Sequence, residues 1–576
     1  MRCVHPRSRF GCVVLAALLL LASASGASAA TRTWTGAAGD LKWNTAGNWS
    51  TGVIPTASDL AQFNASSLTN VTINTNISVL GINTTGFTRT ITQSSACTVT
   101  LGNSGLVIGG GTFTGGNATI DSNGPFTMSG GTFTSTSATL FVYKDLTISG
   151  GTFNHNNGTV RLDGWDKTVA VGNAVLKNLM YDVGGNSITV TGTINVAGDF
   201  TINTVNYMNS GTIAVAGNVV SNDTNIIGYP GTEILFTGAA NQTFTAGVTG
   251  ALVPTVIINK SGGTLSLVGS IGVFNNWTHT AGSVNCGSQA LQFVGFDKTV
   301  TAGTMTYGNV IYNTGGNSIT TAGTMNVSGT FTIQSINYMS GGIIAAKGNV
   351  ITQDNNLIGY PATVIQFDGT GDQQLSANGS YNLVPSIDIK KTTGTLSIVD
   401  QIGIFNNFTY TSGTVNAGAS VIKFVGFDKT ITNTAPGMTF PDIVIDVGGN
   451  SVTVTGAMKV AGNMTITSVN YFQGSGISVS GNLTSTDTSI NSYNAVPIIL
   501  DGSGDQLIDT NNGAGKIPRN LTINKVRCTG GEARLAGNLV INQSGQNLYI
   551  ANGTLNLQDF HLTLSGSAGR ISVQNG

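Results

Sequence analysis

Carboxylates and histidines decide first whether this chain can be a hydrolase. Acid and base hydrolysis of a polysaccharide needs two or three carboxylates that converge on one face. The chain has only two glutamates, Glu233 and Glu532, and no Asp-Asp pair. After the first thirty residues its histidines, His155, His279 and His561, are far apart. The sequence therefore predicts no catalytic cluster and no cofactor, and we interpret the protein as a non-enzyme.

Two glycine-rich loops carry alternating aspartates, Asp368-Gly-Thr-Gly-Asp372 and Asp501-Gly-Ser-Gly-Asp505. Such a spacing can offer oxygen ligands to a hard cation, so these four aspartates are candidate calcium ligands. The corresponding segment earlier in the chain, residues 237–241, has no carboxylate. A tight turn thus fits all three segments, whereas a calcium site fits two at most.

A recurring aromatic-Asp-Lys corner is the other conspicuous motif, because only 9% of the residues are charged. Asp at such a corner can cap backbone amides while the aromatic ring packs on its neighbour. The functional alternative is a ligand contact repeated along a polymer. The motif occurs three times at one constant spacing, as Trp165, Asp166, Lys167; Phe296, Asp297, Lys298; and Phe427, Asp428, Lys429.

The same spacing organises most of the chain into modules of about 131 residues. Gly-Gly-Asn-Ser begins at Gly184, Gly315 and Gly448, so the third copy is slightly longer. We predict a signal peptide in residues 1–30, a Trp-rich cap with the first strands in 31–100, and short-period coils in 101–144. Modules 1, 2 and 3 then cover residues 145–275, 276–406 and 407–538, and a partial fourth module covers 539–576.

A shorter repeat sits inside the modules and predicts the fold. Gly192-Thr-Ile-Asn-Val-Ala-Gly has a close echo that begins at Gly211, and Gly-Thr-Phe recurs at Gly111, Gly131 and Gly151. The residues between these marks alternate with period two, which indicates short strands separated by turns. We predict an all-β, right-handed parallel β-helix, or β-solenoid, of about 27 coils of about 20 residues, roughly 130 Å long. An array of antiparallel sandwiches is the alternative.

Composition narrows the class of partner. With 79 glycines and 11 prolines in 576 residues, and 24 basic against 25 acidic residues, the chain is neither collagen nor a basic nucleic-acid binder. Residues 1–30 have the layout of a cleaved signal peptide, with a transmembrane anchor as the alternative. No later segment is apolar enough to span a membrane. Cys97, Cys286 and Cys528 are too scattered for a disulfide framework.

The segment from Thr31 to Phe63 differs from the rest, with tryptophans at Trp34, Trp43 and Trp49. Its order Trp-x-Gly, Trp, Asn-Trp, Pro, Asp, Phe resembles the N-terminal segment of bacterial surface and autotransporter-like β-strand-repeat proteins. The resemblance implies a surface protein with a long β-helical part. We predict that the tryptophans cap the solenoid; sugar stacking is the alternative. The sequence up to Gly576 shows no barrel-like strands and no sorting signal, which predicts release, an anchoring partner, or that this chain is a fragment of a longer one.

These features predict an exported structural or adhesive protein, secreted or at the cell surface, which contacts polysaccharide or protein of a surface or matrix through many weak sites. The alternative is a carbohydrate-active β-helix protein, either a lyase or hydrolase or a sugar-binding part without catalysis. Neither hypothesis includes a nucleic acid.

Overall fold

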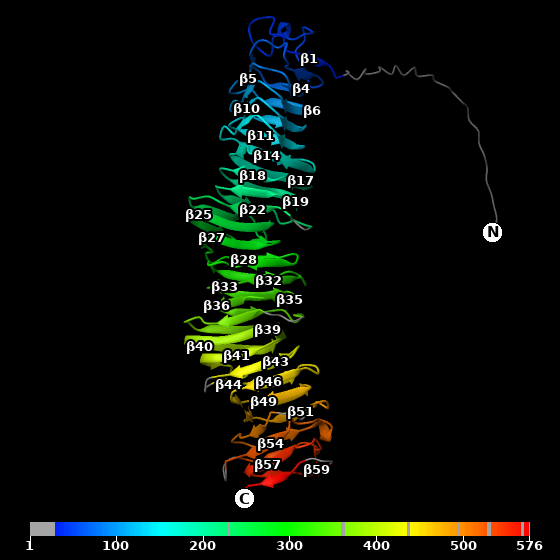
Figure 1. The fold of residues 1–576 in the computed structure, drawn as a ribbon, viewed down its shortest axis with the longest axis vertical. Coiled ribbons are helices and arrows are strands. Elements are labelled where there is room, and N and C mark those ends of the chain that lie inside the picture. The colour runs from blue at the N-terminus through cyan, green and yellow to red at the C-terminus, as the bar shows by residue number, and fades with distance from the viewer. Residues whose placement is uncertain are drawn as a thin grey trace, which may run out of the picture.

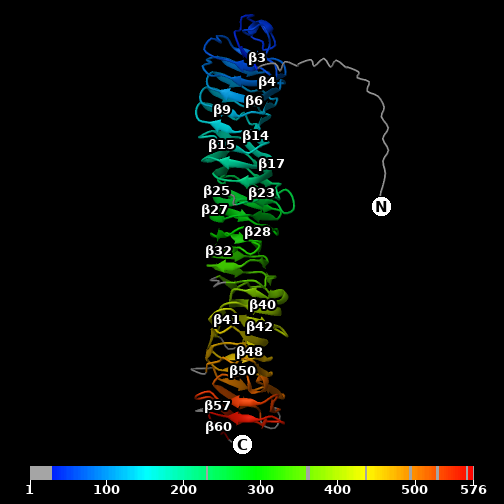
Figure 2. The same cartoon turned by 90° about the vertical axis from the view of Figure 1, so that its right-hand side faces the viewer.

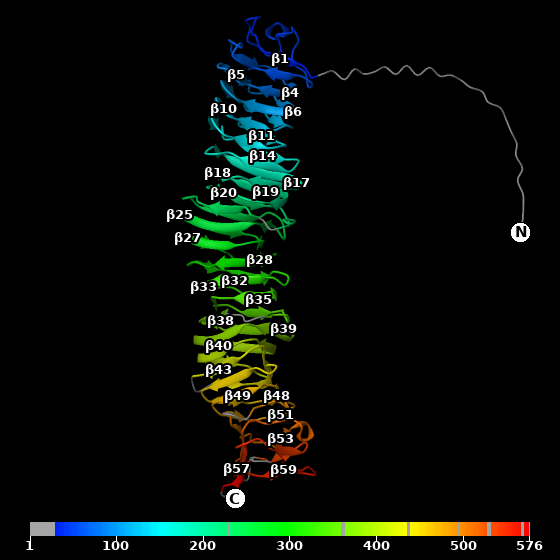
Figure 3. The same cartoon turned by 45° about the vertical axis from the view of Figure 1, so that its right-hand side comes forward.

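The protein is one long rod. The computed structural model describes residues 29–228, 231–358, 363–434, 438–491, 496–526, 531–565 and 569–574. Most of the predicted signal peptide and Cys528 lie outside these residues. From β1 (Thr31–Thr33) at one end to β60 (Ile571–Val573) at the other, the chain winds along the rod in one direction without turning back (Figure 1). The rod is equally elongated in the two turned views (Figures 2 and 3).

The rod is a parallel β-solenoid. One coil holds three strands, for example β14 (Thr159–Asp163), β15 (Lys167–Ala170) and β16 (Val175–Leu176). The next coil lies on it in parallel register, with Leu162 beside Tyr181 and Lys167 beside Ile188. Coils average about 21 residues and number about 24, instead of the predicted 27. The parallel ladders exclude the sandwich array.

Alternation along each strand separates the core from the surface. In β14 the side chains of Val160 and Leu162 are buried and their neighbours are partly exposed. One continuous apolar core runs the length of the rod. Corners between strands use positive φ: Gly164 has a φ of 78°, and a Cβ there would lie 2.9 Å from the ring of Tyr143 on the previous coil. Glycine is required at this corner because both the dihedral and the space exclude a side chain.

The N-terminal end has irregular structure around β1 (Thr31–Thr33), the 3-10 helix Ala46–Asn48 and β2 (Leu60–Gln62). Trp34, Trp43 and Trp49 lie there within 6.2 Å of one another or of the Phe63 ring, centroid to centroid. This aromatic cluster lies over the first coils and continues their core.

In each module one strand ladder ends and a new ladder begins on the following coil, among the residues that the structure describes. β13 (Thr152–Asn154) pairs with β10 (Thr132–Thr134) on one side only, and β16 on the following coil pairs only with β18 (Thr193–Val196). The same gap recurs between residues 283–285 of β27 (Trp277–Asn285) and β30 (Thr306–Tyr307), and between residues 414–416 of β41 (Phe408–Asn416) and β44 (Thr439–Phe440). Neighbouring coils are held by fewer ladders at these three positions.

Candidate functional site

The lysines of the three corners point into the rod. Lys167, Lys298 and Lys429 are each only 4% exposed. The ammonium group of Lys298 donates to the carbonyl oxygens of Phe274 and Phe296 at 2.8 Å and to that of Val294. The other two lysines make corresponding bonds, to Val142 and Asp163 and to Phe405 and Val425. These lysines hold consecutive coils together and are covered from any external ligand.

The aspartates of the corners bind the next coil. Asp166 accepts hydrogen bonds from the backbone N–H of Ser187 at 2.7 Å and from its hydroxyl at 2.9 Å. Asp297 accepts the N–H of Ser318 at 2.8 Å, and Asp428 that of Ser451 at 2.7 Å. Hydrogen bonding to the charged form lowers the pKa of Asp166. Each carboxylate therefore has a structural partner, although all three are exposed.

The aromatic residues of the corners point outward. Trp165 is 70% exposed, and Phe296 and Phe427 are 38% exposed. The ring of Phe296 contacts Phe274 on the coil before it, edge to face, with centroids 5.6 Å apart. Phe427 contacts Phe405 in the same way at 5.8 Å. Of the three residue types in the motif, only the aromatic one presents an apolar surface to solvent.

Further exposed apolar residues continue each corner along the rod. Lys167 of corner 1 pairs with Ile188 on the next coil. Ser187, the neighbour of Ile188, pairs with Tyr207 on the coil after that. Tyr207 therefore lies two coils beyond the corner that contains Trp165. The backbone N–H of Ile227 bonds to Asn206 on the coil before it. We call these surfaces aromatic edges: edge 1 is Trp165, Tyr207 and Ile227; edge 2 is Phe296, Tyr338 and Ile358; edge 3 is Phe427 and Tyr471. All eight side chains are 37–70% exposed.

The sequence motif thus contained one surface residue and two structural residues per corner. The edge tyrosines belong to Asn-Tyr pairs that also recur from module to module. Their spacing marks them as equivalent, but alternation alone does not show which of them is exposed. Only the stacking of coils places Tyr207 and Trp165 on the same edge.

Stability should rise with pH between about 7 and 9.5. Burial lowers the pKa of Lys298 and Lys429 to about 7 and that of Lys167 to about 8, from an ordinary 10.5. Above these values the unfolded chain binds more protons than the folded rod, so raising the pH favours folding. Burial raises the pKa of Tyr181 and Tyr307 above its ordinary 10, which reverses the slope at higher pH.

Thermal unfolding followed by circular dichroism from pH 6.5 to 9.5 measures this dependence. The unfolding temperature should be higher at pH 9 than at pH 6.5. In a variant with both Lys298→Met and Lys429→Met the slope should be smaller, and Lys167, whose pKa is also lowered, should keep part of it. If the unfolding temperature of the unchanged chain stayed constant or fell from pH 6.5 to pH 9, the lowered pKa of these lysines would be contradicted.

The glycine-rich loops enclose a second set of lysines. Lys391, which is 1% exposed, donates to the carbonyl oxygens of Gly369 at 2.7 Å and Gly371 at 2.8 Å and to Oε1 of Gln373 at 2.8 Å. Lys525 binds Gly502 and Gly504 in the third module, and Lys260 binds Gly238, Ala240 and Gln242 in the first. An ammonium group occupies the inner side of each loop.

The four candidate calcium ligands point to other partners. Asp368 forms an ion pair with Lys347, and Asp372 accepts the N–H of Thr395 at 2.8 Å. Two serine hydroxyls, of Ser478 and Ser480, donate to Asp501. Asp505 accepts the N–H of Glu532 at 2.9 Å and pairs with Arg534 at 2.8 Å. No group of three or more His, Cys, Asp or Glu in the described part of the chain could hold a metal.

We therefore expect calcium to leave the stability unchanged. A bound cation would have to displace the ammonium group of Lys391 or Lys525 from the loop carbonyls. The unfolding temperature should be the same, within error, in 5 mM CaCl₂ and in 5 mM EDTA. If the unfolding temperature were higher in CaCl₂, and if this increase disappeared in a variant with both Asp368→Asn and Asp501→Asn, the loops would instead be calcium sites.

The N-terminal tryptophans have no exposed faces. Trp34 and Trp43 are fully buried and Trp49 is 2% exposed. Two of their indole N–H groups are used internally: Trp34 donates to the hydroxyl of Thr69 at 3.0 Å, and Trp49 to the carbonyl of Trp43 at 2.8 Å. A sugar ring has no access to these rings in this conformation.

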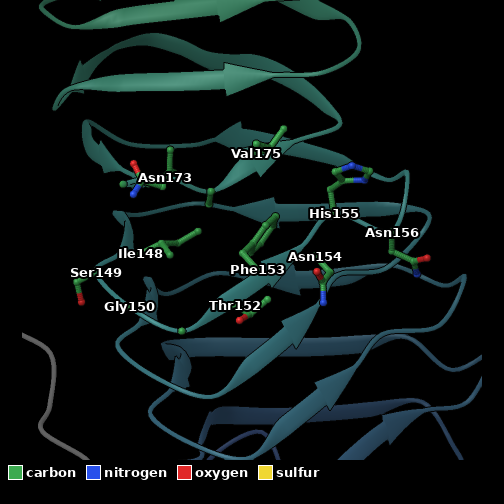
Figure 4. A pocket seen from close by; sticks show the side chains of 14 residues that line it. Ile148, Ser149, Gly150, Thr152, Phe153, Asn154, His155, Asn156, Asn173 and Val175 are labelled. Atoms are coloured by element: carbon green, nitrogen blue, oxygen red, sulfur yellow. The ribbon is translucent and has the colours of Figure 1, made fainter.

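A hollow of about 580 Å³ lies at the first interrupted ladder, between β13 and β16 (Figure 4). The ring of Phe153 and the side chain of Val175 stand between the two coils, with His155 at one end. Asn154 and Asn173 add amide groups to the lining, which includes no titratable side chain except the imidazole. His155 accepts the N–H of Asn157 at its Nδ1 atom.

Comparisons with known proteins add no family to this description. Neither the protein-family models, nor the curated proteins, nor the solved structures give a match to the chain. The β-solenoid that the resemblance implied is present, and no relative is identified. Within the described residues, no helix has the length and apolar character needed to cross a membrane.

Proposed function

We propose that the protein is an exported adhesive rod whose aromatic edges bind neutral glycan chains of a surface or matrix. The observation that carries the proposal is the exposure of edges 1 to 3 in a chain whose other large apolar side chains mostly fill the core. Exposed aromatic rings in register on a rigid scaffold are typical of binding surfaces. The signal-peptide layout of residues 1–30 supports export.

Geometry favours an extended glycan over a folded protein as the ligand. Trp165 and Tyr207 lie two coils apart, which is about 10 Å along the rod. Two linked pyranose rings of an extended polysaccharide have a similar length, so alternate sugars can stack on successive rings. Asparagine, serine and threonine surround each corner and offer hydrogen bonds to hydroxyl groups. The corner lysines are buried, so they give the edge no positive charge to hold an anion.

Binding should decrease when the aromatic rings are removed. We expect a variant with Trp165→Ala, Phe296→Ala and Phe427→Ala to bind at least about tenfold more weakly to beads coated with hydroxyethylcellulose, galactomannan or dextran, because each exposed ring contributes on the order of 1 kcal/mol. Bead depletion assays measure the affinity. The unfolding temperature should change little because these rings are outside the core.

The matched control is Val53→Ala, an exposed apolar residue that is 45% accessible and lies in the N-terminal segment, before edge 1. It should leave bead binding unchanged. Undiminished binding by the triple variant, or absence of binding by the unchanged chain to every bead, would contradict the proposal.

A further inference from the structure

The second corner does not lie above the first. β14 leads into corner 1, and its ladder runs through β17 (Asn178–Val190), β19 (Phe200–Met208), β21 (Val219–Ser221), β23 (Gln242–Ala246) and β25 (Thr255–Val268) to residues 283–285 of β27. Corner 2 is entered from the next strand along the chain, β28 (Ala290–Val294). Corner 2 is therefore displaced by one strand, which is one face of the coil.

The strand that leaves the corner shows the same displacement. β29 (Lys298–Thr301) follows corner 2. Toward the N-terminal end of the rod, its ladder continues through β27, β25, β22 (Glu233–Phe236) and β20 (Thr212–Val215) to β18. In module 1 the strand that follows the corner is β15, whereas β18 lies on the next face. Both sides of the corner thus move by one face between modules 1 and 2.

Modules 2 and 3 repeat this step. The ladder of β28 runs through β31 (Asn309–Asn313), β34 (Phe331–Ser335), β37 (Val350–Thr352), β39 (Gln373–Val384) and β40 (Ser386–Ile404) to residues 414–416 of β41. Corner 3 is entered one strand later, from β42 (Val421–Val425). Since a coil has three faces, the three corners occupy three different edges of the rod.

We propose that the protein cross-links separate glycan chains, one on each aromatic edge, instead of lying along a single chain. This inference rests on the proposed function of the edges. Successive corners are about six coils apart, about 30 Å along the axis, and each faces a new direction. A straight polymer that follows edge 1 cannot also contact edges 2 and 3. The rod is then trivalent toward three chains, and its valency increases by one with each module.

The test compares the unchanged chain with a single-edge variant in which Phe296, Tyr338, Phe427 and Tyr471 are all replaced by alanine. Two measurements are made with hydroxyethylcellulose, galactomannan and dextran. Calorimetric titration gives the affinity for each soluble chain, and light scattering follows agglutination of beads coated with the same polysaccharide. Circular dichroism and the unfolding temperature show that both proteins are folded.

Independent edges predict a clear pattern. The single-edge variant should bind a soluble chain only about threefold more weakly, since three equal sites become one, and it should still bind beads without agglutinating them. If one chain winds along all three edges, the variant should lose a factor of about a hundred or more, which would overturn the inference and leave the proposed function intact. Absence of binding by the unchanged chain would overturn both.

Orientation can be checked without any glycan. Cys97, Cys286 and Cys528 are first replaced by serine, and Trp165→Cys, Phe296→Cys and Phe427→Cys are then introduced and biotinylated. Electron micrographs should show streptavidin bound at these three positions on three different sides of the rod. Labels on one common side would overturn the inference.

Discussion

Replacing Lys391 by methionine should lower the free energy of unfolding of the surrounding coils by about 2–4 kcal/mol. The ammonium group donates to the buried carbonyl of Gly369 and the buried side-chain oxygen of Gln373, and to the partly buried carbonyl of Gly371. Methionine fills a similar volume but donates nothing, so these acceptors lose their partner. Stability in stacked repeats is largely a sum of local terms, and the loss should be concentrated in the coils around the loop.

The adjacent lysine is the matched control. Lys390 is 45% exposed in its side chain and forms a surface ion pair with Asp388 at 2.7 Å. Lys390→Met should therefore change stability by less than about 1 kcal/mol. Hydrogen exchange of the amides near Gly369 and Gly371, together with urea unfolding, distinguishes the two variants. Equal effects at the two positions would contradict the assigned role of Lys391.

Replacing Trp43 by alanine should destabilise the N-terminal end by about 3–5 kcal/mol. The ring is fully buried and contacts Trp49 edge to face, with centroids 4.8 Å apart, and Phe63 at 5.9 Å. A cavity of this size at the end of the core should allow the first coils to open. Hydrogen exchange over residues 60–91 should accelerate strongly, while exchange in the third module should remain as in the unchanged chain.

Trp165→Ala provides the comparison for this second prediction. The same residue type is removed, but from a position that is 70% exposed. Its effect on stability should remain below about 1 kcal/mol. If Trp43→Ala left the exchange of residues 60–91 unchanged, the tryptophan cluster would not be stabilising the end of the rod.

The repeats made the fold predictable. Period-two alternation and short echoes, such as the one from Gly192 to Gly211, required stacked short strands, and the parallel ladders follow from them. The coil count was too high because corners vary in length: the step from Lys167 to its partner Ile188 is shorter than the step from Leu146 to Val169. The coil length taken from the most regular repeats is therefore shorter than the mean coil length of the whole rod.

The chemistry of the site was less predictable. Lysine is rarely buried, so a charged residue beside an exposed corner is naturally interpreted as a surface group. Lys260 and Lys391 do recur at the module spacing, which was the available signal, but nothing in the sequence relates them to loop glycines on the preceding coil. That relation arises only from the stacking of one coil on the next, as does the arrangement of the three edges.

The interrupted ladders have a mechanical consequence. In a rod of this kind the ladder hydrogen bonds run along the long axis, so tension applied to the two ends loads every coil boundary in series. A boundary that lacks pairing between β13 and β16, or between the corresponding strands of the later modules, carries that force on fewer bonds. Under load these boundaries should be among the first to open, so that the rod lengthens in discrete steps and dissipates energy before either end is released.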